Sequence, residues 1–548
     1  MTDIYDFIII GSGAGGGVVA GVLAEAGKRV LILERGKFLS FSEVGRDHLR
    51  NQRISLYGHN AGPEIEGNPR VFVDSRGGEH LIRPHEGGYS NNAATVGGGT
   101  RVYGAQAWRF MQQDFRMAST YGVPDGSSLA DWPLTYDELE PFYERAEWEI
   151  GVSGSHAGNE SQSPRKTPYP MPALRPTKAH AVLKRGADSL GWSTFSTPLA
   201  INSIPRDGRS ACIECSHCVG FACPSDSKNG SQNTMIPRAL KTGLCDLVTQ
   251  AMAERIETDS QGRVTGVVYF VEENGRTIRK TARAKQVVVS AGAIESARLL
   301  LNSKSPHHPN GLGNASDLVG RNLQGHYYPG AQGIFEEEIQ ECQGPGVSIS
   351  MTKFNHGNFG IIGGGMLSDE FIKLPVIFWH RSRPPGVPSW GQANKDWMRH
   401  AFKRTMQITG PVHEIPNSEG RATLDPKVTD RFGIPVVRLS GTTHPETVRT
   451  SEFMRERAIE WLKAAGAVNV WSYRTTLGLS GGQHQAGTCR MGDEPKTSVT
   501  DKWGRVHGHD NLHVIDGSIH VTNGGFNPVL TIFALAFRSA ERLAKTGE

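Results

Sequence analysis

The sequence predicts a mixed fold, α/β plus α+β, in which a discontinuous α/β domain carries an inserted domain built on an antiparallel sheet. Three observations predict it. A strand, glycine turn, helix and strand fill residues 1–36, and a second strand–glycine–helix junction follows at 286–301. Residues 330–475 hold strand-like pieces broken by proline and glycine, and 484–548 return to strand, turn and helix. The two ends of the chain are therefore expected to meet.

The first element is a strand that runs directly into a glycine-rich turn and a helix. The apolar residues 7–10 precede Gly11, Gly13 and Gly16, which have the spacing GxGxxG. Gly11 permits the tight turn, Gly13 lets the backbone approach a pyrophosphate, and Gly16 lets the helix pack closely on the strand. The first helical amides then face the phosphates, where free N–H groups and the helix dipole favour negative charge.

A second strand, 30–33, ends in Glu34, which lies 18 residues after Gly16. A carboxylate at this distance is placed to accept hydrogen bonds from ribose hydroxyls. A glycine-rich turn of an ordinary α/β protein would lack this combination of strand, helix and acid. The unit therefore predicts a Rossmann-like dinucleotide site, and by itself it leaves open which dinucleotide binds, NAD included.

Further elements follow along the chain. Residues 37–110 are rich in loops and end in a glycine track at 97–99. A helix is expected at 135–150, because Thr135 to Glu138 has the pattern of a capped start. Residues 151–175 are rich in Ser, Pro and Gly and are expected to cross the surface. Strands are expected at 266–270 and 286–290, and the second leads through Gly292 into an apolar helix.

Composition excludes several classes of protein. A chain of 548 residues is too long for one compact core, so two or more domains are expected. The net charge of +4 is small for this size, so nucleic acid is not an expected partner. No apolar run of about 18 residues predicts a membrane span. No basic region with a long apolar core precedes the first strand, so we expect a cytoplasmic protein; export with a partner subunit stays open, as does a homo-oligomer.

Four of the seven cysteines lie within twelve residues, at Cys212, Cys215, Cys218 and Cys223. The odd total and this clustering argue against a disulfide framework and favour a reducing compartment. The spacing is similar to an iron–sulfur run, with one extra residue in the last gap. An iron–sulfur cluster, a structural zinc and reduced thiols that pack a loop are the three alternatives.

Near the C-terminus, residues 481–492 read Gly-Gly-Gln-His-Gln-Ala-Gly-Thr-Cys-Arg-Met-Gly, and a turn ending in Asn527-Pro528 follows. With these motifs the chain resembles the glucose–methanol–choline (GMC) family of flavin oxidoreductases over nearly its whole length. The motifs that carry the resemblance occur in the family's order at 11–34, 97–109, 290–301, 319–323, 484–492 and 511–527.

The resemblance implies FAD as the cofactor and hydride transfer from an alcohol carbon to the flavin N5. It implies His484 as the base, since an imidazole titrates near neutrality, and Asn527 as a partner that holds the substrate oxygen. Outside this context a histidine is usually a surface or core residue, and Asn-Pro is commonly a turn. The implied FAD contacts are Gly11, Gly13, Gly16, Glu34, Arg35, Gly97, Gly98, Thr100, Ala253, Ala291, Asp516, Asn527 and Pro528.

The resemblance also implies the domain boundaries. The FAD-binding domain comprises 1–40, 90–110, 235–330 and 484–548, and the substrate-binding domain and loops comprise 41–89, 111–234 and 331–483. Val102 stands where some relatives carry a histidine bonded to the flavin, so non-covalent FAD is expected.

The relatives that the chain resembles are pyranose oxidases, bacterial glycoside oxidases and FAD glucose dehydrogenases. They imply oxidation of a hexopyranose or an O- or C-glucoside at C2 or C3 to a keto-sugar, with O₂ as the acceptor and H₂O₂ as a product. Aromatic stretches at 103–110 and 378–380 are candidate walls for the sugar. The alternatives are a dehydrogenase that passes electrons to a quinone, a cytochrome or an Fe–S partner, and a flavin-bound protein without turnover.

Overall fold

The computed structural model describes residues 4–45, 47–51, 60–90, 92–156, 163–474, 478–479 and 482–546. Gly481 of the C-terminal motif and part of the predicted surface excursion at 151–175 lie outside the described residues. Everything below concerns the described part of the chain.

The largest sheet is parallel at one side and antiparallel at the other. Its parallel strands run in the order β7-β2-β1-β10, and the last residues of β10 also pair with β18 in parallel. The first half of β10 instead pairs antiparallel with β9, which pairs with β8. The strands are β1 (Ile4–Ile10), β2 (Val30–Leu33), β7 (Cys245–Val248), β8 (Ala251–Thr258), β9 (Val264–Glu273), β10 (Arg276–Val289) and β18 (Leu512–Val514).

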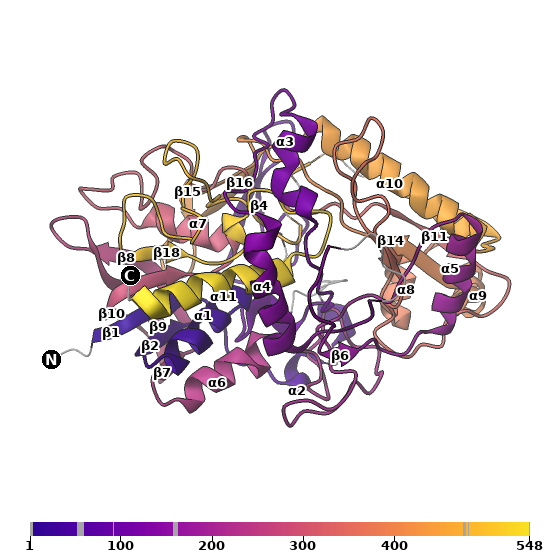
Figure 1. The fold of residues 1–548 in the computed structure, drawn as a ribbon, viewed down its shortest axis with the longest axis horizontal. Coiled ribbons are helices and arrows are strands. Elements are labelled where there is room, and N and C mark those ends of the chain that lie inside the picture. Colours follow the sequence, from indigo (N-terminus) through magenta and orange to yellow (C-terminus); the bar gives the residue numbers. More distant parts are fainter. Residues whose placement is uncertain are drawn as a thin grey trace.

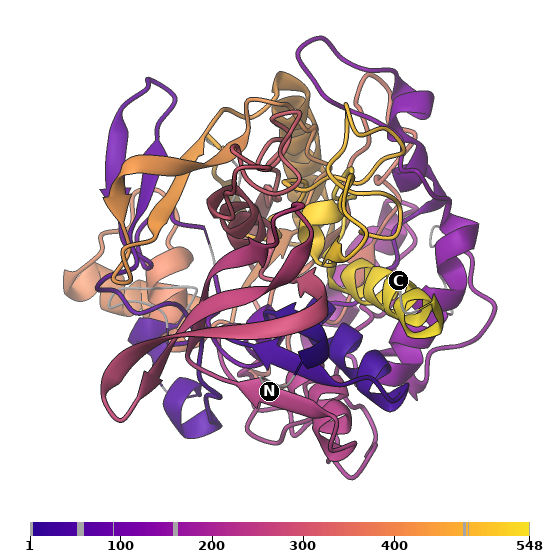
Figure 2. The same ribbon diagram turned by 90° about the vertical axis from the view of Figure 1, so that its left-hand side faces the viewer.

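Helices from both ends of the chain pack together on this sheet. Helix α1 (Ala14–Glu25) is apolar and buried almost throughout, because it lies between β1 and α11 (Val529–Thr546), with α6 (Met235–Lys241) along its other side. Figure 1 shows α1 beside α11, and Figure 2, which views the molecule from the left-hand side of Figure 1, shows the indigo first elements next to the yellow last helix.

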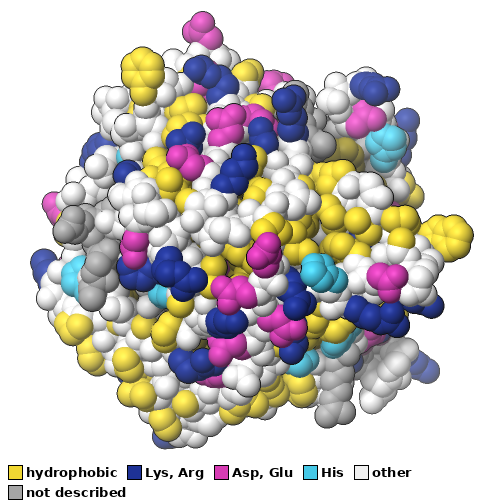
Figure 3. All heavy atoms as spheres, turned by 90° about the vertical axis from the view of Figure 1, so that its right-hand side faces the viewer, with side chains coloured by type: hydrophobic (Ala, Val, Ile, Leu, Met, Phe, Trp, Pro, Cys, Tyr) yellow, Lys and Arg dark blue, Asp and Glu magenta, His cyan; other side chains and the backbone are white. Residues whose placement is uncertain are grey.

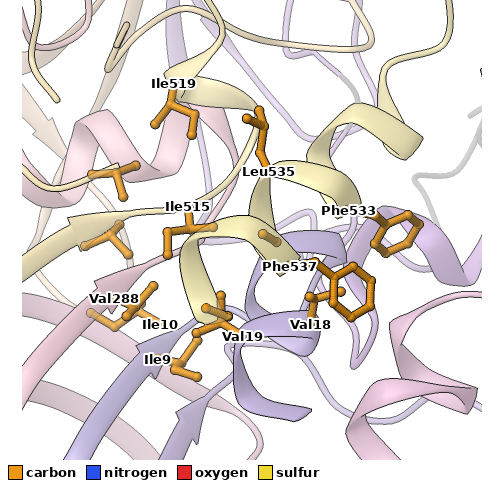
Figure 4. Close-up of a cluster of buried hydrophobic side chains, with 14 of the residues drawn as sticks. Ile9, Ile10, Val18, Val19, Val288, Ile515, Ile519, Phe533, Leu535 and Phe537 are labelled. Carbon is orange, nitrogen blue, oxygen red and sulfur yellow. The ribbon is translucent and has the colours of Figure 1, made fainter. Parts of the chain in front are cut away.

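Figure 4 shows the side chains that hold these elements together. Ile9 and Ile10 of β1 belong to one buried cluster with Val19 of α1 and Ile515 after β18. All four are at most 5% exposed. At roughly 25 cal/mol per Å² of apolar surface removed from water, such close packing of strand and helices is the main stabilising contribution to this half of the molecule. The glycine turn between β1 and α1 is therefore held on a rigid base.

The second half of the molecule is built on an antiparallel sheet in the order β12-β13-β14-β11-β17. Helix α10 (Pro445–Ala464) covers one face, and α5 (Lys178–Ser189) packs on α10, as Figure 1 shows on its right-hand side. The indole N–H of Trp461 on α10 donates to the Leu183 carbonyl of α5 at 2.9 Å. The strands are β11 (Gly330–Ile334), β12 (Ser350–Met351), β13 (Leu367–Asp369), β14 (Thr405–Thr409) and β17 (Asn469–Ser472).

A four-stranded sheet, β15-β16-β3-β4, packs against α7 (Ala293–Asn302). We predicted that residues 330–475 contribute to one antiparallel sheet, but β15 and β16 leave it, and β16 pairs in parallel with β3. A pairing across so many residues leaves no local signal in the sequence. These strands are β3 (Arg70–Val73), β4 (Glu79–Ile82), β15 (Arg421–Thr429) and β16 (Pro435–Ser440).

The predicted capped helix is confirmed as α4 (Tyr136–Ala146). The Glu138 N–H donates to the Thr135 hydroxyl at 3.2 Å, and the Thr135 N–H donates to the Glu138 carboxylate at 2.8 Å. The mixed class of the fold, with a sheet of largely parallel strands and a separate antiparallel sheet, is confirmed as well. The remaining helices and strands are α2 (Phe41–Val44), α3 (Met117–Tyr121), α8 (Pro375–Arg381), α9 (Gly391–Ala401), β5 (Ser153–Gly154) and β6 (Met171–Pro172).

The surface carries no single dominant charge on the face shown in Figure 3, where Lys and Arg side chains alternate with Asp and Glu. Within the described ranges, no helix has both the length and the apolarity that a bilayer crossing requires.

Candidate active site

The glycine turn after β1 adopts a shape that side chains would block. Gly11 has φ +98°, and a Cβ there would lie 2.3 Å from the Ser290 carbonyl oxygen. A Cβ at Gly16 would lie 2.0 Å from the Gly11 carbonyl oxygen. Gly13, at the N-cap of α1, has open space where its Cβ would be. The structure therefore gives the three glycines different tasks: turn, helix packing and open approach.

Glu34 closes the end of this turn. Its carboxylate accepts hydrogen bonds from the Ser12 amide at 3.0 Å, the Ser12 hydroxyl at 2.7 Å and the Gly36 amide at 2.8 Å. Burial nevertheless raises the pKa of Glu34, because desolvation of the charged form outweighs these donors. Ser12 also accepts from the Gly97 amide at 3.1 Å. Sequence analysis missed Ser12, which ties the turn, the acid and the second glycine loop together.

The second glycine loop lies against the first. Gly97 and Gly98 both have positive φ, and a Cβ at Gly98 would lie 3.0 Å from the Cα of Gly13. The Thr100 hydroxyl donates to the Gly97 carbonyl at 2.7 Å, which fixes the loop. The backbone of both glycine loops therefore faces the same open space, with no side chain between them.

Asp516 connects the start of α7 with the turn that follows β18. Its carboxylate accepts from the Gly292 amide at 2.9 Å and the Ser296 hydroxyl at 2.6 Å, both at the start of α7. It also accepts from the Ser518 amide at 2.8 Å. An acid at a helix N-terminus is favoured by the free amides and the dipole there.

All these groups border one cavity of about 1210 Å³, larger than the roughly 300–1,000 Å³ of a usual small-molecule pocket. The cavity runs from Glu34 to His484, which leaves room for a dinucleotide and a second molecule. Gly16 and Gly97 shape its walls without lining it. The other predicted cofactor contacts line it: Gly11, Gly13, Glu34, Arg35, Gly98, Thr100, Ala253, Ala291, Asp516, Asn527 and Pro528.

These residues fit FAD. In the described part of the chain, the buried Nη2 of Arg35 and Oδ1 of Asn527 have no hydrogen-bond partner. Buried polar atoms are normally paired, so an unpaired donor and an unpaired acceptor on the cavity wall favour a polar ligand. Backbone loops open at Gly13 and Gly98 provide the approach that a pyrophosphate needs.

His484 lies at the far end of the cavity in a strained backbone conformation, with φ +59°. The side-chain amide of Asn523 donates to its carbonyl oxygen at 2.7 Å and holds this conformation. Its Nδ1 atom lies 2.9 Å from Nδ1 of His326 and 3.2 Å from the hydroxyl of Tyr328. Burial lowers the pKa of His484 to about 4, so the ring is neutral at pH 7.

Asn527 lies beside this histidine and is joined to it through Tyr328. The Asn527 side-chain amide donates to the Tyr328 hydroxyl at 3.1 Å. The structure therefore brings both predicted catalytic residues, His484 and Asn527, to one place. Sequence analysis missed His326 and Tyr328, although they follow directly after the family motif at 319–323.

The floor of the cavity at this end is polar. Gln332 of β11 and Gln407 of β14 are register partners, and the Lys373 ammonium donates to the Gln407 side chain. Of the two predicted aromatic stretches, Tyr103 and His380 line the cavity. Phe378 was a wrong candidate, because it stacks on Trp397 with ring centroids 4.9 Å apart and belongs to the core.

The four clustered cysteines border a separate pocket of about 10 Å³. All are free thiols, and no three of them come within 4.8 Å of one another in the described structure. Burial raises the pKa of Cys212, Cys215 and Cys218. The separation of the thiols does not support the iron–sulfur alternative.

Asp114, His356 and His413 are the described residues whose ligand atoms do converge within 4.8 Å. The carboxylate of Asp114 lies 3.0 Å from Nε2 of His356 and 2.5 Å from Nε2 of His413, and the Tyr121 hydroxyl lies 2.9 Å from Nδ1 of His356. These distances describe a hydrogen-bond network around a buried carboxylate, and the two histidines help to hold the pKa of Asp114 low.

Comparison with known proteins adds the family. Residues 5–328 match the N-terminal model, and residues 416–536 the C-terminal model, of the family described as GMC oxidoreductase. The chain is 32% identical to 6'''-hydroxyparomomycin C oxidase of Streptomyces lividus, over 99% of this chain and 91% of that protein. It is 28% identical to the fructose dehydrogenase large subunit of Gluconobacter japonicus, over 98% and 97%. The structure of pyridoxine 4-oxidase from Mesorbium loti is similar in fold, with TM-score 0.61, 17% identity, and coverage of 98% and 99%.

Proposed function

This chain belongs to the GMC oxidoreductase family and is an FAD-binding enzyme that acts on CH–OH groups, and we propose that its substrate is a hexopyranose or a glycoside. The hydroxyl oxidised is a secondary one, at C2 or C3, and the product is a keto-sugar. O-glucosides and C-glucosides are both included. The proposed acceptor is O₂, which gives H₂O₂.

One observation carries the proposal. A neutral histidine and an amide, His484 and Asn527, are linked through the Tyr328 hydroxyl. They border the same cavity as the backbone stretches 11–16 and 97–100, here called the dinucleotide cradle. A base and a group that holds the oxygen are what alcohol oxidation needs at the reacting carbon.

The lining of the cavity supports a substrate with many hydroxyl groups. The amides of Gln332 and Gln407, the ammonium of Lys373 and the carboxylate of Glu370 all border the substrate end. In the described part of the chain the buried Oε1 atom of Gln332 has no hydrogen-bond partner, which favours a polar ligand at this end. The names of two relatives, which specify an aminoglycoside and fructose, point to the same chemical class.

Bound FAD supplies a two-electron acceptor that takes a hydride at N5. The proposed task of His484 is to accept the hydroxyl proton of the substrate, which makes the adjacent C–H bond a better hydride donor. Asn527 holds the substrate oxygen near His484, and Tyr328 keeps the two side chains in register. Partial burial lowers the pKa of His484, which keeps the imidazole in its basic, neutral form at pH 7.

FAD is proposed to bind without a covalent link. Val102 lines the cavity at the position where some relatives carry a histidine, and an isopropyl group cannot form that bond. Acid precipitation should therefore release all of the flavin into the supernatant.

The test is anaerobic reduction of the flavin by a panel of substrates. We expect bleaching of the flavin absorbance with glucose or with O- and C-glucosides, and a 2-keto or 3-keto product by NMR. Formation of a C6 aldehyde would contradict the proposed position. Absence of bleaching with every sugar and glycoside, in a protein that retains FAD, would contradict the proposed substrate class.

The second candidate is a dehydrogenase that passes electrons to a quinone, a cytochrome or an Fe–S partner. The name of one relative, the fructose dehydrogenase large subunit, favours it, because that name specifies a dehydrogenase rather than an oxidase. Turnover with a quinone or a cytochrome and without H₂O₂ would establish this alternative. Rapid H₂O₂ formation with a sugar in air would exclude it.

A further inference from the structure

His326 lies between the proposed base and a backbone carbonyl. Its Nδ1 atom is 2.9 Å from Nδ1 of His484, and its Nε2 atom is 2.9 Å from the carbonyl oxygen of Gly524. The two rings meet edge to face, with an interplanar angle of 85°. This residue is 5% exposed. Neither the cradle nor the proposed chemistry described above gives it a task.

The surroundings of His326 fix which of its nitrogens carries the proton. A carbonyl oxygen can only accept a hydrogen bond, so Nε2 of His326, which faces Gly524, must donate. Burial, with the nearby His484 and His413, lowers the pKa of His326 well below its usual range, so the ring carries one proton. Its Nδ1 atom is therefore an acceptor.

His484 must therefore be the donor of the hydrogen bond between the two histidines. Nδ1 of His484 donates to Nδ1 of His326, which leaves the lone pair of His484 on Nε2. In the described structure Nε2 of His484 is neither hydrogen-bonded nor fully buried, and its ring lines the cavity. The lone pair is thus on the nitrogen that a substrate can reach.

We propose that His326 is a positioning residue that keeps Nδ1 of His484 protonated and Nε2 free to take the substrate proton. The proposal rests on the proposed role of His484. The hydroxyl proton would pass to Nε2 of His484, and FAD, when bound, would accept the hydride that the carbon loses as the alcohol becomes a carbonyl. The imidazolium formed on His484 would keep its Nδ1–H bond to His326, as metal-bound and triad histidines keep theirs to a neighbouring carboxylate or carbonyl.

The first test measures the tautomer directly in the FAD-loaded protein. Long-range ¹⁵N–¹H spectra of histidine-labelled protein distinguish Nδ1–H from Nε2–H, and the His484 signals are assigned by their loss in H484N. We expect the Nδ1–H form in the wild type and a shift toward Nε2–H in His326→Leu. An Nε2–H signal in the wild type would overturn the proposal. This readout does not depend on which substrate the enzyme takes.

The second test measures turnover with any substrate that bleaches the flavin. Removal of the acceptor in His326→Leu is expected to lower kcat about 10- to 100-fold at unchanged FAD content, the usual effect of losing a partner that orients a functional histidine. His326→Asn keeps an acceptor near the position of Nδ1 and should recover most of the loss. Equal loss in both variants, or loss that follows FAD content, would overturn the proposal. If His326→Leu does not fold, the wild-type spectrum and His326→Asn decide.

Discussion

The two ends of the cavity are built in different ways. At the cradle, the surface is backbone, and its shape comes from short stretches at 11–16 and 97–100 in which glycine is required by φ or by close approach. At the other end the surface is side chains from three separate segments, which bring together His326, His484 and Asn527. A backbone surface recognises what all dinucleotides share, whereas a side-chain surface can hold a proton and select a substrate.

The largest expected effect comes from a substitution at the end of the cavity that is built from side chains. His484→Ala should lower kcat/KM by about 10²- to 10⁴-fold, the usual effect of removing a general base, while FAD stays bound. Steady-state kinetics with measured FAD content check it.

His509→Ala is the control, since burial also lowers the pKa of His509 to about 4 but its ring packs against His308 outside the cavity. Near-normal turnover in His484→Ala would show that this histidine is not the base.

The next largest effect comes from a substitution in the dinucleotide cradle, which leaves the side-chain end of the cavity unchanged. Gly11→Ala combines a positive φ with a Cβ 2.3 Å from the Ser290 carbonyl oxygen, so the turn must shift. We expect a lower Tm and loss of most of the FAD, with φ strain by itself contributing about 1–3 kcal/mol. Differential scanning fluorimetry and the ratio of flavin to protein absorbance measure the two effects.

Gly27→Ala is the matched control for the cradle, because Gly27 has φ +82° but nothing within 4 Å of its Cβ position. It should carry the φ strain without loss of FAD. If the two variants behave alike, the close approach at Gly11 has no importance beyond backbone strain.

The smallest effect is a displacement of the pH profile. A base acts only in its neutral form, so kcat/KM should be constant above the pKa of His484 and fall as the pH drops through it. Since burial lowers this pKa to about 4, the acidic limb should lie well below the ordinary histidine value of about 6.5. A profile of kcat/KM from pH 4 to 8 checks it, and an acidic limb at or above 6.5 would show that His484 is as hydrated as a surface histidine.

The cradle was predictable because its information is local. Gly11, Gly13, Gly16 and Glu34 belong to one strand–turn–helix–strand unit, and each follows from what that unit must do. The capped start of α4 was predictable for the same reason, since Thr135 and Glu138 are three residues apart. The parallel pairing of β16 with β3 was not predictable, because the two strands are far apart in the sequence.

The end of the cavity that is built from side chains was predictable from the sequence only in part. His484 and Asn527 were found through the resemblance to a family. His326 and Tyr328 were not, because a histidine or tyrosine gains its role from its hydrogen-bond neighbours in the folded chain. The cysteine cluster shows the limit of spacing as a signal. Its spacing left an iron–sulfur cluster, a zinc ion and reduced thiols open, and in the folded loop no three of the thiol sulfurs lie within 4.8 Å of one another.

The sequence by itself determined that a dinucleotide binds at the first glycine turn, since chain geometry allows few other uses for that pattern. Only the tertiary structure places His326 beside His484, and the proposed position of the lone pair on His484 depends on that contact. Protonation depends on burial and on neighbours from distant parts of the chain, and those neighbours exist only after folding.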